Sequence, residues 1–262
     1  MIQPSSKLYL LGLLVASLHL LLLGSGAWAQ PRENSEYCRA DGRIAILLVD
    51  ITTPYDQTDK DTIVRMTDQI LTSIKGGEKL VVRTIADSHT RSERLIERCI
   101  PFCPAAGVFG RLFNCSDGII RTDHERVRAE VISSLRQRLS TFQELPHSDI
   151  IRTIFSVAKE DATPEHPITL YVYSDLIENS DYLPTKLLFS HSTRRLMYGL
   201  TSHFHLIAAL KDAEVFVSGV GRAGTLDRRP LKVAELQKLT EFWQAYFKEC
   251  GAKSINIAQN SI

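Results

Sequence analysis

The chain has 262 residues, of which 44% are hydrophobic and 23% charged, and its formal net charge is +1. This length is sufficient for one large domain or two small ones with a real hydrophobic core. A charge close to zero argues against a non-specific nucleic-acid binder, because such proteins carry a basic excess. An ordinary content of 14 Gly and 10 Pro excludes the collagen-like and low-complexity classes.

Residues 1–29 have the features of a secretory signal peptide. Lys7 precedes an apolar run over residues 8–23, and Ala27-Trp28-Ala29 follows. One cation, a short apolar core and an A-x-A site are typical of a cleaved signal. The run of 16 residues is shorter than the ~20 needed to span a bilayer, which disfavours an uncleaved anchor. We therefore expect cleavage after Ala29 and a periplasmic or secreted mature chain with no stable membrane span.

Apolar runs and amphipathic segments alternate along the rest of the chain. The apolar runs predict strands at residues 43–50, 79–86, 168–174 and 214–218, and a short edge strand at 254–257. Apolar spacings of three and four predict helices at residues 59–75, 123–143, 148–158, 185–210 and 231–250. This alternation predicts an α/β fold with a doubly wound, mostly parallel central sheet flanked by helices. An extension at 30–42 would precede this domain, which runs from 43 to 262.

Five cysteines lie in a chain that we expect to be exported, and an oxidising compartment favours disulfides. Cys38 precedes the first strand and Cys250 ends the last helix, so both are predicted at the amino edge of the sheet and are expected to pair. Residues 88–120 contain the other three cysteines and are predicted to form an irregular, disulfide-tied excursion. Cys115 is expected to pair with Cys99 or Cys103. Because five is an odd number, the remaining thiol is expected to be free.

Two predicted strands end in an acidic residue beside hydroxyl groups. The first strand ends with Asp50-Ile51-Thr52-Thr53, and the third ends with Ser174-Asp175. Ligands of open α/β sheets bind at the carboxyl ends of the strands, where the loop that contains Ser148 is also expected. Oxygen ligands suit a hard cation, so Asp50, Thr52, Ser148 and Asp175 are predicted to bind Mg²⁺ or Mn²⁺. For a single Asp, the alternative is a capping role on the next helix.

These residues resemble the metal-ion-dependent adhesion site of von Willebrand factor A-type (vWA) domains, and the resemblance covers residues 43–258. The first loop of that family reads Asp-x-Ser-x-Ser and here becomes Asp50-Ile51-Thr52-Thr53-Pro54, so Pro54 replaces one ligand. By this resemblance, Ser148 stands for the Thr of the second loop and Asp175 for the Asp of the third. The chain also resembles an exported bacterial subgroup that has Ser-Asp-Leu-x-x-Asn-Ser in the third loop.

The resemblance implies a binding module and not an enzyme. In the family, a carboxylate of a partner fills the open coordination position of the metal, because a cation held by few protein charges attracts an acidic ligand. We therefore expect a protein partner with an acidic group, in protein binding or envelope assembly, and no nucleic-acid partner. The departure at Pro54 leaves a metal-free structural module as an alternative.

A phosphatase of the haloacid-dehalogenase type is the enzymatic alternative, with Asp50 as nucleophile and Ser174 as the second motif residue. The general acid would then be Thr52, whose hydroxyl cannot exchange a proton at neutral pH as a carboxyl does.

Two further patterns have structural interpretations. Arg194-Arg195 is expected to be solvated surface, and the aromatic residues of the last helix are expected to be core, namely Phe242, Trp243, Tyr246 and Phe247.

Overall fold

The structure is a computed structural model in which the chain divides into Met1–Glu33 and a compact unit at Asn34–Ile262. The predicted signal peptide lies outside the described residues. The second unit is described here over residues 37–103, 115–141, 145–161, 166–222 and 231–258.

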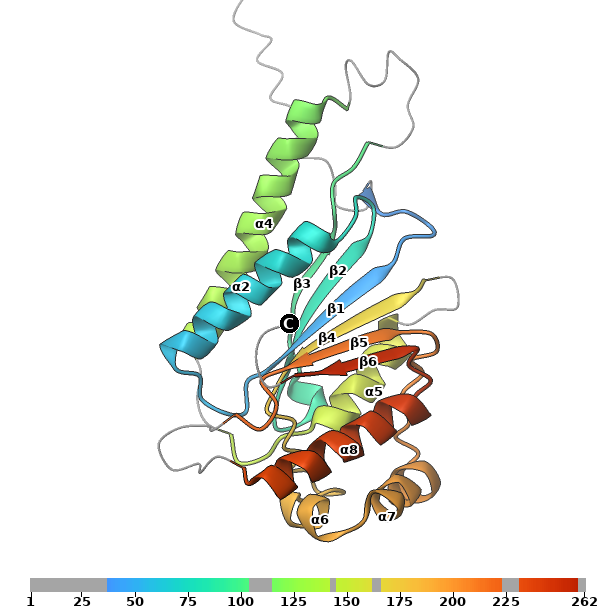
Figure 1. The fold of residues 1–262 in the computed structure, drawn as a ribbon. Coiled ribbons are helices and arrows are strands. Elements are labelled where there is room, and N and C mark those ends of the chain that lie inside the picture. Colours follow the sequence, from blue (N-terminus) through green and yellow to red (C-terminus); the bar gives the residue numbers. More distant parts are fainter. Residues whose placement is uncertain (1–36, 104–114, 142–144, 162–165, 223–230, 259–262) are drawn as a thin grey trace, which may run out of the picture. The chain divides into compact units, whose positions relative to one another are not determined.

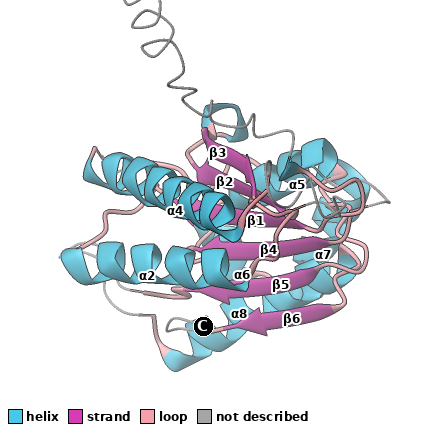
Figure 2. Cartoon of the chain, turned by 90° about the horizontal axis from the view of Figure 1, so that it is seen from above, coloured by secondary structure: helices cyan, strands magenta, loops and turns pink. Residues whose placement is uncertain are grey.

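A six-stranded sheet forms the centre of this unit, with the order β3-β2-β1-β4-β5-β6 (Figures 1 and 2). Its strands are β1 (Ile44–Asp50), β2 (Lys79–Ile85), β3 (Arg94–Cys99), β4 (Ile168–Tyr173), β5 (Glu214–Ser218) and β6 (Ser254–Ile257). All neighbouring pairs are parallel except β2 and β3. The chain order reverses between β1 and β4, so the topological switch point lies at their carboxyl ends. The predicted doubly wound, mostly parallel α/β fold is confirmed.

Helices cover both faces of the sheet. Figure 1 shows α2 (Gln57–Ser73) and α4 (Asp117–Ser140) on one face, and α5 (Ile150–Asp161) and α8 (Val233–Glu249) on the other. A further layer packs against α8 and consists of α6 (Thr185–Ser190), α7 (Thr193–Tyr198) and the π-helical turn η3 (Gly199–Phe204). A short 3-10 helix, η2, covers His89–Arg91. Within the described residues, no helix is both long enough and apolar enough to cross a membrane.

The two layers explain why the strands read as continuous apolar runs. Ile46 and Leu48 of β1 pack in the core with α5 and α8, whereas Leu47 and Val49 pack in the core with α2 and α4. A strand covered on both faces has no solvent-facing positions, so the alternation of polar and apolar residues disappears. The aromatic residues of α8 that were predicted to be core are all fully buried, namely Phe242, Trp243, Tyr246 and Phe247.

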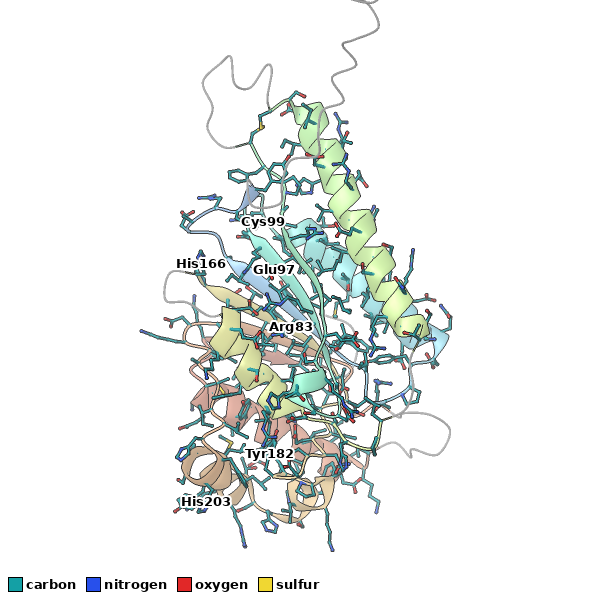
Figure 3. All side chains as sticks on the ribbon, turned by 180° about the vertical axis from the view of Figure 1, so that it is seen from behind. Arg83, Glu97, Cys99, His166, Tyr182 and His203 are labelled. Carbon is teal, nitrogen blue, oxygen red and sulfur yellow. A yellow bond between two sulfur atoms is a disulfide. The ribbon has the colours of Figure 1, made fainter. Side chains whose placement is uncertain are left out.

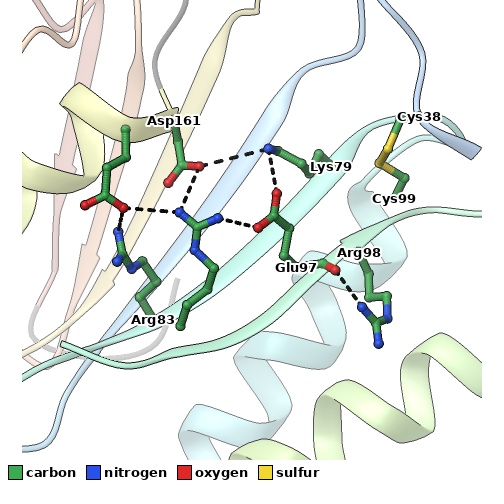
Figure 4. Close-up of polar contacts among 9 residues, drawn as sticks. Cys38, Lys79, Arg83, Glu97, Arg98, Cys99 and Asp161 are labelled. Carbon is green, nitrogen blue, oxygen red and sulfur yellow. Dashed lines mark hydrogen bonds and ion pairs between the residues drawn. A yellow bond between two sulfur atoms is a disulfide. The ribbon is translucent and has the colours of Figure 1, made fainter. Parts of the chain in front are cut away.

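The predicted irregular excursion at 88–120 is wrong in part, because this segment contains β3 and the start of α4. β3 is an antiparallel edge strand that carries charges, so it lacks an apolar run. Ion pairs join β2 to its neighbours β3 and α5. Lys79 Nζ of β2 lies 3.0 Å from Glu97 of β3, and Arg83 of β2 lies 2.6 Å from Glu160 of α5 (Figures 3 and 4). The signal that sequence patterns use for buried strands is therefore absent from β3.

The predicted disulfide between Cys38 and Cys250 is also wrong. Cys38 pairs with Cys99, Cys103 pairs with Cys115, and Cys250 is a buried free thiol. Because β3 runs antiparallel, its last residue returns to the amino edge of the sheet, where Cys99 stands opposite Lys79. The carbonyl of Cys250 instead accepts a hydrogen bond from the backbone of Leu210 just before β5, on the other side of the sheet. The Cys103–Cys115 bridge is one of the two pairings that the sequence left open.

Candidate functional site at the carboxyl edge of the sheet

Asp50 is the last residue of β1, and its side chain collects hydrogen bonds from two strand ends. Its Oδ1 accepts from the backbone N–H of Thr52 at 2.9 Å and from the Thr52 hydroxyl at 2.6 Å. Its Oδ2 accepts from the hydroxyl of Ser174, which follows β4, at 2.6 Å. β1 and β4 are parallel neighbours, so their carboxyl ends meet. Asp50 is only 1% exposed, and both of its oxygens are engaged.

Asp175 joins three loops at the same edge. Its Oδ1 accepts from the backbone of Ile177 at 2.9 Å, and its Oδ2 accepts from the hydroxyl of Thr53 at 3.3 Å. Its carbonyl accepts from the backbone of Gly221, which follows β5, at 3.0 Å. The side chain is buried. The structure therefore brings Asp50, Thr52 and Asp175 to one place, as the sequence predicts, and adds the hydroxyls of Thr53 and Ser174.

The two buried carboxylates repel each other. Burial raises the pKa of Asp50, and the negative charge of Asp175 raises it further, although the hydroxyls of Ser174 and Thr52 act in the opposite direction. A pair of this kind is stabilised by a proton on one carboxyl or by a cation between the two groups. The raised pKa of Asp50 therefore reflects a negative charge at the end of β1 that is only partly compensated.

Arg222 brings one positive charge to this edge. Its Nη1 donates to Asp59 Oδ2 at 3.1 Å and to the carbonyl of Pro54 at 3.3 Å, and its guanidinium lies 4.2 Å from the ring centroid of Tyr55. Burial alone would lower the pKa of Arg222, but its acidic neighbours, Tyr55 and Asp175 foremost, raise it. Sequence reasoning missed this residue. Its position directly after Gly221, beyond the end of β5, was the signal that could have found it.

The charges and donor atoms at this edge fit a hard divalent cation. Asp50, Asp59 and Asp175 carry three negative charges when ionised, and Arg222 offsets one of them. Carboxylate and hydroxyl oxygens are the ligands that Mg²⁺ takes. Within the described residues, no group of three or more His, Cys, Asp or Glu side chains is arranged to hold a metal ion. A cation here would therefore be held by the carboxylates of Asp50 and Asp175 with neighbouring hydroxyl oxygens.

Ser148, the fourth predicted ligand, lies on a segment that crosses the same edge. The backbone of Leu145 donates to the carbonyl of Thr52 at 3.2 Å, and Ser148 exchanges two backbone hydrogen bonds with Asn179. Its hydroxyl is buried and has no hydrogen-bond partner. No hydrogen bond joins Ser148 to Asp50 or Asp175 in the described part of the chain. The structure thus places Ser148 at the edge of the site and not within its network.

The first amides of α5 donate to the side chain of Glu178 and not to the hydroxyl of Ser148, which has no hydrogen-bond partner. Glu178 Oε2 accepts from the backbone of Ile150 at 2.9 Å and of Ile151 at 3.0 Å. Glu178 is completely buried, and burial raises its pKa to about 8, with the charge of Asp149 acting in the same direction. Sequence reasoning also missed this residue, although it lies within the Ser174–Ser180 motif.

No protein-family model and no curated protein matches this chain. Among solved structures, it resembles proximal thread matrix protein 1 from the mussel byssus, with TM-score 0.40 and 9% identity over 80% of this chain and 48% of that one. It resembles the ArnB paralog VWA2 from Sulfolobus acidocaldarius, with TM-score 0.40 and 11% identity over 84% of this chain and 42% of that one. It also resembles a von Willebrand factor type A protein from Catenulispora acidiphila, with TM-score 0.35 and 11% identity over 80% of this chain and 43% of that one.

The chain spans less than half the length of each of these three proteins. Two of them carry the von Willebrand factor A name. TM-scores of 0.40 and below decide neither family nor function, so the vWA resemblance, the exported subgroup and the metal site stay predictions. The functional argument therefore depends on the geometry at the carboxyl edge.

Proposed function

We propose that this chain is an exported protein-binding module that holds a divalent cation, Mg²⁺ or Mn²⁺, between Asp50 and Asp175. The observation that carries the proposal is the buried pair of carboxylates at the switch point of the sheet. Arg222 leaves two negative charges of this group without compensation, and a divalent cation supplies the balance. Thr52 and Thr53 extend the oxygen donor set, and Ser148 brings a further buried hydroxyl to the same edge.

The partner proposed for this site is a protein that presents a carboxylate. A cation held by few protein charges keeps electrophilic character and attracts an acidic ligand. The two disulfides support an oxidising location, extracellular or periplasmic, where such a partner would be a secreted or envelope protein.

A metal-free structural module is the second candidate. In that case a proton on Asp50 relieves the repulsion, and the raised pKa of this carboxyl favours such a state. The phosphatase alternative has less support, because Thr52 occupies the position of the general acid and its hydroxyl cannot exchange a proton at neutral pH as a carboxyl does.

Thermal unfolding of the mature chain, stripped with EDTA and titrated with Mg²⁺ or Mn²⁺, separates these candidates. Saturable binding stabilises the folded state by about 2.7 kcal/mol at a hundredfold excess over Kd, or about 5–10 °C in Tm. The shift is expected in the parent chain and in Asp41→Asn, whose side chain is 75% exposed, and is expected to vanish in Asp175→Asn. The absence of a shift with both metals would support the metal-free module.

A further inference from the structure

The helical layer outside α8 carries an aromatic surface. Tyr198 is 62% exposed and Phe204 is 45% exposed, and they are two of the four large hydrophobic side chains that are exposed in the described residues. Both belong to the layer of α6, α7 and η3 that lies on the side of α8 away from the sheet (Figure 1). Figure 3 shows His203 of the same layer at the outer end of the unit, far from Cys99.

The same layer is basic. Residues 185–211 contain no Asp or Glu, whereas the chain as a whole has 30 acidic residues in 262, which corresponds to about three in a segment of this length. The segment contains four exposed cationic residues and three histidines, namely Lys186, Arg194, Arg195, Lys211, His191, His203 and His205. The side chains of Arg194 and Arg195 form no ion pair or hydrogen bond in the described part of the chain. Their charges are therefore free to act on a ligand.

The basic and aromatic side chains form one continuous surface. Arg194 and Arg195 precede Tyr198 by four and three residues, and such spacings place helical side chains side by side. The ring of Tyr198 lies 5.5 Å from the ring of His203. A Cβ atom built on Gly199 would lie 3.9 Å from the Phe204 ring, so Phe204 packs beside the end of α7.

Phe204 ends the π-helical turn η3 with its ring partly exposed. Leu196 and Leu200 are buried at a spacing of four, and Phe204 follows Leu200 by the same spacing. In η3 the turn widens, and the backbone of Leu206 donates to the carbonyl of Leu200 at 2.9 Å. The ring of Phe204 packs 5.6 Å from the ring of Tyr182 and stays 45% exposed.

We propose that Arg194, Arg195, Tyr198, His203 and Phe204 form a surface that docks this chain on an anionic phospholipid membrane. Arginines beside exposed aromatic rings suit the membrane interface, where the cations contact phosphate groups and the rings enter the headgroup layer. Residues 185–211 contain no acidic residue, so this segment contributes only positive charge to the surface, which favours attraction to a negative bilayer. This proposal goes beyond the cation site and does not depend on it.

The shape of this layer favours a bilayer over a bound peptide. Peptides are recognised in grooves or along sheet edges, whereas a bilayer is flat. The hollows found in the described residues include one of about 600 Å³ between α2 and α4, one of about 570 Å³ along α8 and one of about 420 Å³ beside the Cys38–Cys99 disulfide, and none of these is lined by residues 185–211. The layer lies on the outer side of α8 in Figure 1, and the side chains of Arg194, Arg195, Tyr198, His203 and Phe204 are all exposed.

Co-sedimentation of the mature chain with vesicles tests this proposal. The chain is expected to bind vesicles with about 30% phosphatidylglycerol in phosphatidylcholine at low salt, and to be released at high salt or from pure phosphatidylcholine. Each arginine near an anionic surface contributes about a fivefold change in affinity, so Arg194→Gln/Arg195→Gln should bind about 25-fold more weakly. Tyr198→Ser/Phe204→Ser should also bind the anionic vesicles more weakly at low salt, because the rings no longer enter the headgroup layer.

The matched control is Arg121→Gln/Arg136→Gln, which removes two exposed arginines from α4 and should leave vesicle binding unchanged. Circular dichroism verifies that every variant is folded. Parallel assays in EDTA and in Mg²⁺ without EDTA separate vesicle binding from the proposed cation site. Equal loss in the α4 control, or no sedimentation with the anionic vesicles, would overturn the proposal. Binding to polyglutamate without binding to vesicles would also overturn it, because it would identify an acidic protein as the ligand.

Discussion

The hydroxyl of Ser174 donates a hydrogen bond to the carboxylate of Asp50 over 2.6 Å, and this contact joins the ends of β1 and β4. The two residues lie 124 positions apart in the chain and meet because their strands are parallel neighbours. The same hydroxyl accepts a hydrogen bond from the backbone of Leu176 at 2.9 Å. Ser174 thus determines both the turn after β4 and the environment of the buried carboxyl.

Replacing this serine tests the importance of the contact. Ser174→Ala leaves Asp50 Oδ2 buried without its hydroxyl donor, which costs about 1–3 kcal/mol in the free energy of unfolding. For a domain of this size, Tm should fall by about 2–4 °C for each kcal/mol. Urea unfolding measures the loss, and Ser190→Ala, at an exposed position, should be close to neutral. Equal stability of the two variants would contradict this reading of the site.

Glu178 makes stability depend on pH. Burial raises its folded-state pKa from 4.5 to about 8, so the folded state holds a proton that the unfolded state releases between these values. The contribution of protonated Glu178 to the free energy of unfolding is complete below about pH 4.5 and is lost as the pH rises to about 8. Glu178→Gln keeps an acceptor for the amides of Ile150 and Ile151 but cannot ionise.

We therefore expect the free energy of unfolding of the parent chain to fall across this pH range, and to fall less in Glu178→Gln. Asp50, whose pKa is also raised by burial, acts in the same direction in both chains. Urea titrations at several pH values, with Glu241→Gln on the exposed side of α8 as control, measure the difference. Parallel pH profiles for all three chains would contradict the prediction.

Replacing Arg222 should lower the stability of the chain but raise its affinity for the cation. Arg222→Gln removes the mostly buried positive charge that pairs with Asp59 and acts on Asp175, so stability in EDTA should fall by about 3–5 kcal/mol. The same change makes the site more negative and should therefore increase the affinity for Mg²⁺. Calorimetric titration with Mg²⁺ checks the second effect, and Arg65→Gln, exposed on α2, is the control. A loss of both stability and affinity would mean that Arg222 shapes the site instead of competing with the cation.

The two disulfides should contribute unequally to the free energy of unfolding. In the chain-entropy model, a loop of 61 residues between Cys38 and Cys99 gives about 4 kcal/mol, and a loop of 12 between Cys103 and Cys115 gives about 3 kcal/mol. Double Cys→Ala variants of each pair, compared by urea unfolding, test this order. Cys250 stays reduced in both variants and is an internal reference.

Thiol titration tests the connectivity itself. Burial raises the pKa of Cys250 to about 12, so its thiol should react with an alkylating reagent only after unfolding. Non-reducing peptide mapping should then find one labelled cysteine and the two bridges described above. A bridge between Cys38 and Cys250 would contradict the structure.

Local sequence patterns were sufficient for the five parallel strands and for the position of Asp50 and Asp175. A strand buried on both faces needs a continuous apolar run, and such a run is visible without knowledge of its neighbours. The carboxyl ends of parallel strands meet at one edge, so two acidic residues directly after such runs are brought together by topology alone. The hydroxyls at 52, 53 and 174 follow from the same reasoning because they adjoin the acidic residues.

Contacts across the sheet depend on strand order and direction, which local patterns do not contain. β3 runs antiparallel and carries charges, and for this reason Cys99 returns to the side of Cys38 while Cys250 lies near β5. Arg222 and Glu178 became visible only through the loops that they reach, since a single charged residue in a loop has no periodicity. The exposed ring of Phe204 was likewise not visible from the sequence, because its spacing of four from the buried Leu200 by itself predicts burial.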